Sequence, residues 1–175
     1  MPQRTCSRFL VLTSGLLCLC ALLGVLPAAG EEYPRAPNFT LPDVNDKKVE
    51  LKSLLGKGPV VVDFWATWCK PCKEEFAHLQ SFTERYRDKG LKIITIATDG
   101  PKTASQVKPF ILGRRYTFGV LLDTNQEVTR LYKVKVLPTT FLIDNDGRVR
   151  YTHTGYRPGT EKILEGEILK ILEKS

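Results

Sequence analysis

The sequence predicts one α/β domain, in which helices lie on both sides of a central sheet. Two continuous apolar runs, residues 60–65 and 91–97, are typical of strands that are buried on both faces of a parallel or mixed sheet. Apolar residues at helical spacing follow each run, first in 71–89 and then in 103–116. A hairpin and a last helix follow residue 138. This order of strands and helices predicts an α/β sandwich.

The composition agrees with one folded globular domain. Of 175 residues, 42% are hydrophobic and 26% are charged, which excludes a disordered, repetitive or collagen-like protein. The formal net charge is +7, but the basic residues are spread along the chain without a run of five like charges. Because the sequence has no basic helix, no zinc-finger spacing and no mixed aromatic and basic motif, it argues against nucleic-acid binding.

Residues 1–30 have the features of an export signal. Arg4 and Arg8 precede an apolar run over 9–26, and small residues just before position 31 suit cleavage there. The run lies at the lower limit of length for a membrane-spanning helix, so an uncleaved membrane anchor is the alternative. Both interpretations place the domain, residues 31–175, outside the cytoplasm.

The first elements of the domain form an N-terminal β extension. Residues 39–44 and 48–51 predict two short strands around the polar turn 45–47. Residues 60–65 then predict a buried strand in which Asp63 is the one polar residue.

The first predicted helix spans 71–89. Pro71 suits its first turn, and Gly90 ends it. A second buried strand spans 91–97. A proline and a glycine within the segment 103–116 oppose a long regular helix, so we expect a short or kinked one there.

The second half predicts a strand, a helix, a β-hairpin and a last helix. The strand spans 119–122, and Thr124 and Glu127 have the spacing of a capping box for the helix that follows. Strands at 139–144 and 148–153 flank an Asn-Asp-Gly turn, which is a strong hairpin signal. The last helix is predicted by apolar residues at helical spacing, which are Ile163, Leu164, Ile168, Ile171 and Leu172.

Only two of the five cysteines, Cys69 and Cys72, lie in the predicted domain. A bridge over so short a loop adds less stability than one over a long loop, so a structural disulfide explains the pair poorly. A zinc site needs a second cysteine pair, and covalent haem attachment needs His where Lys73 stands. A redox-active dithiol, with no cofactor beyond the Cys69–Cys72 disulfide, fits best. His78 and His153 have no metal partners in sequence, so we expect no metal site.

The position of the pair predicts different roles for its two sulfurs. The three-residue spacing brings both side chains onto one helical face, about 5–6 Å apart. Cys69 lies at the predicted helix N-terminus, where unpaired N–H groups and the helix dipole lower the pKa of a thiol below the free value of about 8.5. We therefore expect Cys69 to be the attacking sulfur, open to solvent. Cys72, one turn into the helix, is expected to be the buried resolving sulfur.

The segment around the pair resembles a known active site. Residues 62–72, VDFWATWCKPC, are similar to the active-site segment of the thioredoxin superfamily. A fuller pattern adds the exported start, APNF at 36–39 and LPTTFLID at 137–144. It resembles the TlpA/ResA-like thiol-disulfide oxidoreductases of the bacterial envelope over nearly all of 36–175. The resemblance implies a thioredoxin-like three-layer sandwich with the N-terminal β extension and a βα insertion at 103–122.

The resemblance also implies roles at individual positions. Cys69 and Cys72 match the redox pair. Pro138 matches a cis-proline beside the disulfide, which would leave the Leu137 backbone free to pair with an extended substrate segment. Glu75 matches an acidic residue that adjusts the thiol pair. Its alternative interpretation is a solvated Glu near the start of the helix.

Aromatic and acidic residues flank the pair. We expect Trp68 to be a partly exposed lid at the substrate-binding surface and Trp65 to lie in the core. Asp63 stands where the TlpA/ResA-like branch often has Asn. A carboxyl group in an apolar strand should have a raised pKa and lie close enough to Cys72 to exchange a proton. A structural Asp, hydrogen-bonded near the end of the strand, is the alternative.

These features predict an exported thiol-disulfide oxidoreductase. The resemblance implies a reductant of disulfide-containing client proteins, such as apocytochromes c, that is recharged by a membrane-embedded thiol-disulfide electron donor. A thiol peroxidase of the peroxiredoxin type is one alternative, although its usual Pro, Thr and Cys arrangement is missing. A non-catalytic envelope interaction domain that keeps the disulfide for rigidity is another.

Overall fold

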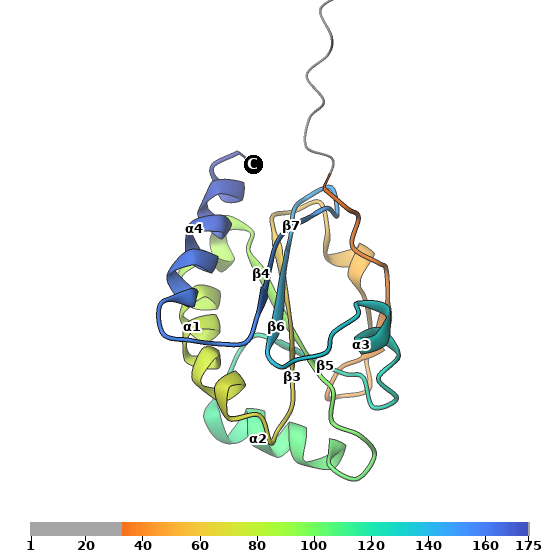
Figure 1. The fold of residues 1–175 in the computed structure, drawn as a ribbon. Helices are drawn as coiled ribbons and strands as arrows, with labels where there is room; N and C mark the ends of the chain where they lie inside the picture. The colour runs from red at the N-terminus through yellow and green to blue at the C-terminus, as the bar shows by residue number, and fades with distance from the viewer. Residues whose placement is uncertain (1–32, 175) are drawn as a thin grey trace, which may run out of the picture. The chain divides into compact units, whose positions relative to one another are not determined.

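The computed structural model describes residues 33–174 (Figure 1). The predicted signal or anchor, residues 1–30, lies outside the described residues. Within the described part, no helix combines the length and the apolar character that crossing a membrane requires.

A five-stranded mixed sheet forms the centre of the domain. Its order is β5-β4-β3-β6-β7, with bounds Gly119–Leu122, Lys92–Ala97, Val60–Trp65, Thr139–Ile143 and Val149–Thr154. The middle strand β3 pairs in parallel with β4 and antiparallel with β6. Because it has a neighbour on each side and helices on both faces, every residue of β3 is buried, as its apolar sequence predicts. β6 and β7 form the predicted hairpin.

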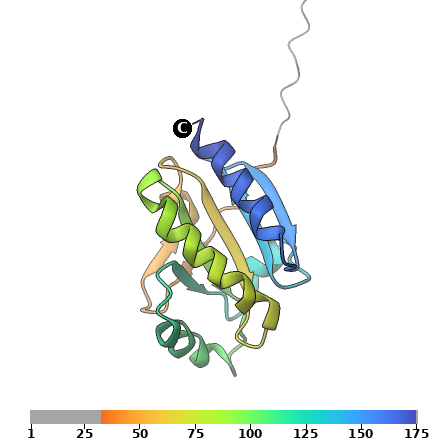
Figure 2. The same ribbon diagram turned by 90° about the vertical axis from the view of Figure 1, so that its left-hand side faces the viewer.

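Helices cover both faces of this sheet (Figures 1 and 2). α1 (Lys70–Tyr86) and α4 (Thr160–Leu172), the predicted last helix, pack on one face. α2 (Val107–Arg114) buries its apolar residues in the same layer as α1. α3 (Glu127–Leu131) packs on the opposite face. The predicted three-layer sandwich is confirmed.

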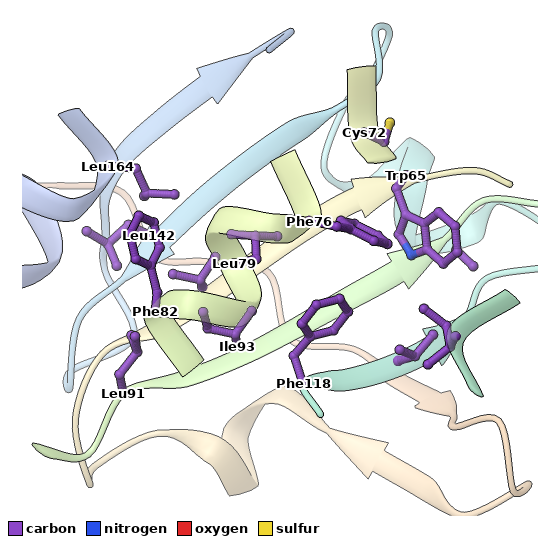
Figure 3. Close-up of a cluster of buried hydrophobic side chains, with 14 of the residues drawn as sticks. Trp65, Cys72, Phe76, Leu79, Phe82, Leu91, Ile93, Phe118, Leu142 and Leu164 are labelled. Carbon is purple, nitrogen blue, oxygen red and sulfur yellow. The ribbon is translucent and has the colours of Figure 1, made fainter. Parts of the chain in front are cut away.

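Alternate residues of β3 divide the core into two layers. Val61 and Trp65 lie in the α1 layer, whereas Phe64 lies in the α3 layer, since successive side chains of a strand point to opposite faces. Figure 3 shows the α1 layer, where Phe76 lies beside Trp65 and Cys72 lies at the adjacent end of α1. The core beneath α1 is therefore continuous with the end of β3 that carries the cysteines.

The predicted βα insertion at 103–122 comprises α2 and β5. A 3₁₀ turn, Ala104–Gln106, leads into α2, in agreement with the short helix expected there. Phe110 of α2 contacts Trp65 and Phe76, with ring centroids 5.4 and 6.4 Å apart. The insertion therefore packs against the α1 layer next to the end of β3.

The N-terminal extension is the predicted antiparallel hairpin of β1 (Thr40–Pro42) and β2 (Lys48–Glu50). Asp43 closes its turn, because its Oδ1 accepts hydrogen bonds from the N–H groups of Asn45 at 2.7 Å and Lys47 at 2.9 Å. A single bridge from Asp43 attaches the hairpin to the edge strand β5.

Two glycines permit a close contact between the loop before β3 and the end of α1. α1 ends at Tyr86, three residues before the predicted end, and Gly90, with a positive φ of 97°, ends the 3₁₀ turn Arg87–Lys89 that follows it. Gly58 also has a positive φ, of 121°. A Cβ atom on Gly58 would lie 2.3 Å from the Gly90 carbonyl oxygen, and one on Gly90 would lie 2.4 Å from the Lys57 oxygen. Neither position has room for a side chain.

α3 is present, but the predicted capping box of Thr124 and Glu127 is wrong. Gln126 is the capping residue, with a positive φ of 55° and no side-chain hydrogen bond to the helix. Asp123, buried directly after β5, instead accepts hydrogen bonds from the N–H of Thr129 at 2.7 Å and from its hydroxyl at 2.6 Å. The Asp123 carboxylate accepts the hydrogen bonds of N–H groups in the first turn of α3, so Thr124 is not needed as a capping residue.

Candidate active site at the Cys69–Cys72 disulfide

The two cysteines lie where β3 leads into α1. A tight turn follows the strand, closed by a hydrogen bond from the Cys69 N–H to the Ala66 carbonyl at 3.0 Å. Cys69 is the N-cap of α1, and Pro71 lies in the first turn. Cys69 and Cys72 form a disulfide with their Cα atoms 5.4 Å apart. The Cys69 sulfur also accepts a hydrogen bond from the Cys72 N–H at 3.3 Å. The attacking sulfur of the prediction therefore faces an N–H group of the first helical turn.

The two cysteines differ in exposure. Cys69 is 4% exposed and Cys72 is 0% exposed. The order agrees with the predicted attacking and resolving roles, because only Cys69 presents any surface to another molecule. The expectation that Cys69 is open to solvent is wrong in degree. Cys69 belongs to the same buried apolar cluster as Trp65 and Ala66.

Asp99 fixes the turn that precedes Cys69. Its carboxylate accepts hydrogen bonds from the Thr67 N–H at 2.9 Å and from the Thr67 hydroxyl at 2.6 Å. Asp99 is buried and follows β4, and β4 runs parallel to β3. The sequence analysis missed this residue. A signal was present, since polar residues directly after neighbouring parallel strands meet at one edge of a sheet.

Asp63 and Glu75 are both buried beside Thr140. The Thr140 hydroxyl lies 3.1 Å from Asp63 Oδ1 and 3.1 Å from Glu75 Oε1. Burial raises the pKa of Asp63 well above its ordinary value, and the nearby Glu75 raises it further, whereas the Thr140 hydrogen bond lowers it. Burial also raises the pKa of Glu75 to about 7. The interpretation of Glu75 as a solvated helix-start residue is wrong, because it lies on the face of α1 that packs onto the sheet.

Only one oxygen of each carboxyl group is hydrogen-bonded. Asp63 Oδ2 and Glu75 Oε2 are buried and have no hydrogen-bond partner among the described residues. Asp63 stands at the fourth of the six positions of β3 and has one hydrogen bond, from Thr140, so its proton-transfer role and its structural alternative both stay predictions. Buried carboxyl groups with raised pKa values are typical of functional sites.

The strand registers place these groups in a polar row across the sheet. Thr95 of β4 lies opposite Asp63, Asp63 lies opposite Thr140 of β6, and Thr140 lies opposite His153 of β7. Residues directly opposite in neighbouring strands point to the same face, here the α1 layer. The row therefore extends from the interior of the sheet to the edge strand, and the sequence analysis did not identify Thr140 in it.

The predicted substrate-binding residues lie at the same end of β3. The Leu137–Pro138 bond is cis, as the resemblance implies. The register of β6 against β3 places Pro138 beside the end of β3 that leads to Cys69. Trp68 is 69% exposed, which agrees with its expected place at the surface, and Val136 is also exposed. Trp68, next to Cys69 in the chain, is thus an exposed apolar side chain at this end of the sheet.

The histidines make aromatic contacts. The His78 ring lies 5.9 Å from that of Tyr156, and the His153 ring stacks on Tyr151 at 6.4 Å, both measured between centroids. Within residues 33–174, no three His, Cys, Asp or Glu side chains are grouped so that they could hold a metal ion.

The sequence is similar to those of known proteins. Residues 34–152 match the AhpC/TSA family. Thiol-disulfide oxidoreductase ResA from Bacillus thuringiensis (strain Al Hakam) is 43% identical over 136 residues, which cover 78% of this chain and 76% of that protein. The chain belongs to the AhpC/TSA family. The ResA of Bacillus subtilis (strain 168) is 38% identical over 156 residues, which cover 85% of this chain and 86% of that protein.

Solved structures support the same assignment. A protein from Chlorobium tepidum described as thiol:disulfide interchange protein DsbE has a TM-score of 0.75 and 34% identity, with 81% of this chain and 98% of that chain covered. StoA from Bacillus subtilis has a TM-score of 0.63 and 26% identity, with 77% and 98% covered. The fold is thioredoxin-like and the ResA-like chain is a thiol-disulfide oxidoreductase. The peroxiredoxin alternative is not favoured.

Proposed function

We propose that this ResA-like protein reduces disulfide bonds of client proteins outside the cytoplasm, with Cys69–Cys72 as its redox centre and no further cofactor. The observation that carries the proposal is the position of Cys69. Its sulfur caps α1 by accepting a hydrogen bond from the Cys72 N–H at 3.3 Å. Of the two cysteines, only Cys69 has any exposed surface. Such a position stabilises a thiolate in the reduced protein and leaves it within reach of a client.

The reaction proceeds through a mixed disulfide. In the reduced enzyme, the Cys69 thiolate attacks one sulfur of a client disulfide, and the other client sulfur leaves with the electron pair. Cys72 then loses its proton and attacks the Cys69 sulfur, so the Cys69–Cys72 bond forms and the second client sulfur leaves. The client gains two electrons and two protons, and the enzyme ends as the disulfide observed here.

Asp63 and Glu75 supply the proton chemistry of the second step in this proposal. Cys72 is buried, so solvent cannot readily take its proton. Glu75 stands three residues after Cys72 on α1, and residues at this spacing lie on one helical face. With its pKa raised by burial to about 7, Glu75 is suited to accept and return a proton near neutral pH. The Thr140 hydroxyl contacts both Glu75 and Asp63 and so links the two carboxyl groups.

The surface around the disulfide suits an extended client segment. Trp68 offers an exposed apolar ring beside the pair, and Leu137 and Pro138 precede β6 at the same end of the sheet. We infer that a client strand lies along the Leu137 backbone, with its disulfide over Cys69.

The cellular setting is part of the proposal. The export features of residues 1–30 support a place in the periplasm or on the outer face of the cytoplasmic membrane, with the same segment as a possible anchor. There a membrane-embedded thiol-disulfide donor would return the pair to the dithiol. Apocytochromes c, whose cysteines must be reduced before haem attachment, are the client class that the resemblance suggests.

Trapping of mixed disulfides tests this function. A Cys72→Ala protein, expressed with its own leader, keeps the attacking sulfur but cannot resolve, so we expect it to accumulate covalent complexes that thiol reductants release. The matched control is Cys69→Ala with Cys72→Ala, which should capture nothing. Capture of clients by the double variant, or none by Cys72→Ala, would contradict the proposal.

The reduction potential decides the direction of transfer. A reductant should have a potential well below about −180 mV, measured by equilibration with glutathione or dithiothreitol of known ratio. A value near that of the strong oxidants, about −120 mV, would show that the protein makes disulfides instead.

A further inference from the structure

Thr140 contacts two buried carboxyl groups with one hydroxyl. Its Oγ1 lies at hydrogen-bond distance, 3.1 Å, from Asp63 Oδ1 and equally from Glu75 Oε1. A threonine hydroxyl has one proton, so it donates to one carboxyl oxygen only. The second contact is a hydrogen bond only if the other carboxyl is protonated and donates to the Thr140 oxygen. If both contacts are hydrogen bonds, the pair therefore holds at least one proton.

The surroundings offer no other way to hold two negative charges. Asp63 and Glu75 are 0% and 3% exposed, and among the described residues no Lys, Arg or His forms an ion pair with either. Two unpaired buried carboxylates at this separation would repel each other in a medium that solvates them poorly. With one shared proton, the pair carries a single charge.

We propose that Asp63 and Glu75 share one proton through the Thr140 hydroxyl, and that Thr140 is a positioning residue that keeps one carboxylate ready to accept the Cys72 proton. The proposal deepens the proposed function and rests on it. It assigns a role in the resolving step to a residue of β6 that lies outside the CxxC helix.

The proton balance follows the exchange reaction. Before resolution the pair holds one proton. When Cys72 attacks the Cys69 sulfur, its proton passes to the ionised carboxyl, so the pair holds two. The bond between Cys69 and the client sulfur breaks, the client sulfur leaves with the electron pair, and it takes up one proton. The pair then returns to one proton, and no further reactant is needed.

Other titratable groups face the pair from the elements around it. Cys72 lies on α1, Tyr151 and His153 lie on β7, and Tyr156 precedes α4. Burial and nearby carboxylates, Glu75 among them, raise the pKa of Tyr151 and of Tyr156, so both stay neutral near pH 7. His153 lies opposite Thr140 in register, so a variant at this position serves as a separate control.

Thr140→Val tests the role of the hydroxyl, because valine has nearly the same shape and no hydroxyl group. Loss of the donor should raise the pKa of the remaining base. In stopped-flow measurements of mixed-disulfide resolution, we expect the pH profile to move up by about one pH unit, with a rate about tenfold lower on its acid limb. Attack by Cys69 on the client disulfide should keep its rate. Thr140→Ser should restore the original profile.

Two controls separate this effect from a general disturbance of the sheet. Thr95 lies opposite Asp63 on the other neighbouring strand, and its hydroxyl donates to the Gly119 carbonyl. Thr95→Val should leave the pH profile of resolution unchanged. His153→Asn should leave it unchanged as well. A Thr140→Val protein with the wild-type profile, or a Thr95→Val protein with an equal shift, would overturn the inference. If the wild-type protein forms no mixed disulfide at all, the proposed function fails instead.

Infrared spectroscopy counts the proton without any activity. At pH 8, above the pKa of about 7 of Glu75, the oxidised wild-type protein should show the carbonyl stretch of one protonated buried carboxyl, and Thr140→Val should change its frequency. The band should be absent in the double variant of Asp63→Asn and Glu75→Gln. Two such bands, or none, in the wild-type protein would overturn the shared proton.

Discussion

Asp99 holds Thr67 by two hydrogen bonds, one from the N–H group at 2.9 Å and one from the hydroxyl at 2.6 Å. Thr67 lies two residues before Cys69, and Asp99 follows the neighbouring strand β4. The pair therefore ties the turn that carries the attacking sulfur to the end of a second strand. The position of Cys69 therefore depends on a residue that is hydrogen-bonded to Thr67 and not to either sulfur.

Asp99→Ala should destabilise the protein by about 2 kcal/mol, because it leaves the buried N–H and hydroxyl of Thr67 without acceptors. Asp99→Asn keeps one good acceptor and should cost less. Urea unfolding measures both. The control is Asp88→Ala, at an exposed Asp in the 3₁₀ turn that follows α1, which should change stability by less than about 0.5 kcal/mol. Equal stability of the Asp99→Ala and Asp88→Ala proteins would disprove the role of Asp99.

Stability should fall as the pH rises from about 4.5 toward 7. Burial raises the pKa of Glu75 from 4.5 to about 7, so in this range the folded protein holds a proton that the unfolded chain releases. The contribution is fully present below pH 4.5 and is lost as the pH passes about 7. The raised pKa of Asp63 acts in the same direction. For Glu75 alone the difference between the two values corresponds to about 3 kcal/mol.

Urea unfolding between pH 4 and pH 8 measures this dependence. Glu75→Gln carries no titrating group at this position, so its stability should vary less with pH than that of the wild-type protein. Glu74→Gln, at the exposed neighbouring position, should keep the wild-type dependence. If the free energy of unfolding changed with pH equally in the Glu75→Gln and Glu74→Gln proteins, the role of Glu75 would be disproved.

Trp68→Ala should weaken client reduction while leaving the fold intact. The ring is 69% exposed, so its loss should change stability by less than about 0.5 kcal/mol. An exposed aromatic ring beside the reacting sulfur is typical of a binding hot spot, and we expect reduction of a protein disulfide to slow about tenfold. Reduction of a small aromatic disulfide reagent, which needs no extended contact, should keep its rate.

The matched control for Trp68 is Leu131→Ala. Leu131 is also an exposed apolar residue, but it lies on α3, which covers the opposite face of the sheet. It should leave both reactions unchanged. If Trp68→Ala slowed reduction of the protein disulfide and of the small reagent equally, the ring would affect the reactivity of the thiol rather than client binding.

Gly58→Ala should destabilise the protein far more than Gly56→Ala. The added Cβ on Gly58 would meet backbone atoms of Gly90 at 2.3 Å, which only movement of the loop or of the helix end can relieve. We expect a cost of several kcal/mol, or failure to fold. Gly56 also has a positive φ, of 83°, but nothing lies within 4 Å of an added Cβ, so its cost should be about 1 kcal/mol. Thermal unfolding of both proteins compares them, and similar melting temperatures would be unexpected.

Local patterns were sufficient to predict the elements of the fold. The apolar run 60–65 coincides with β3, and the Asn-Asp-Gly turn lies between β6 and β7. The end of α1 near Gly90 was likewise visible, because a positive φ after a helix favours glycine. These features depend on periodicity or on the backbone preference of one residue, which a single sequence displays.

Features that depend on strand register were not visible. Thr140 reaches Asp63 because β6 pairs antiparallel with β3, and the two residues are 77 positions apart in sequence. Asp123 replaces the expected capping box for a similar reason, since the capping atom comes from the end of a strand rather than from the start of the helix. The sequence identified Asp63 and Glu75 as candidates. Only the folded sheet shows that both contact the same residue, Thr140.

The contact of Phe110 with Trp65 has a consequence for how such proteins can diversify. Trp65 is the last residue of β3, and its indole Nε1 has no hydrogen-bond partner within the described chain, so it depends on neighbouring rings for shelter. One of the two rings that contact it, Phe110, comes from α2, in the segment inserted after β4. Shortening this segment to a plain loop would let water reach the floor beneath the disulfide, and its length is therefore constrained by the chemistry above it.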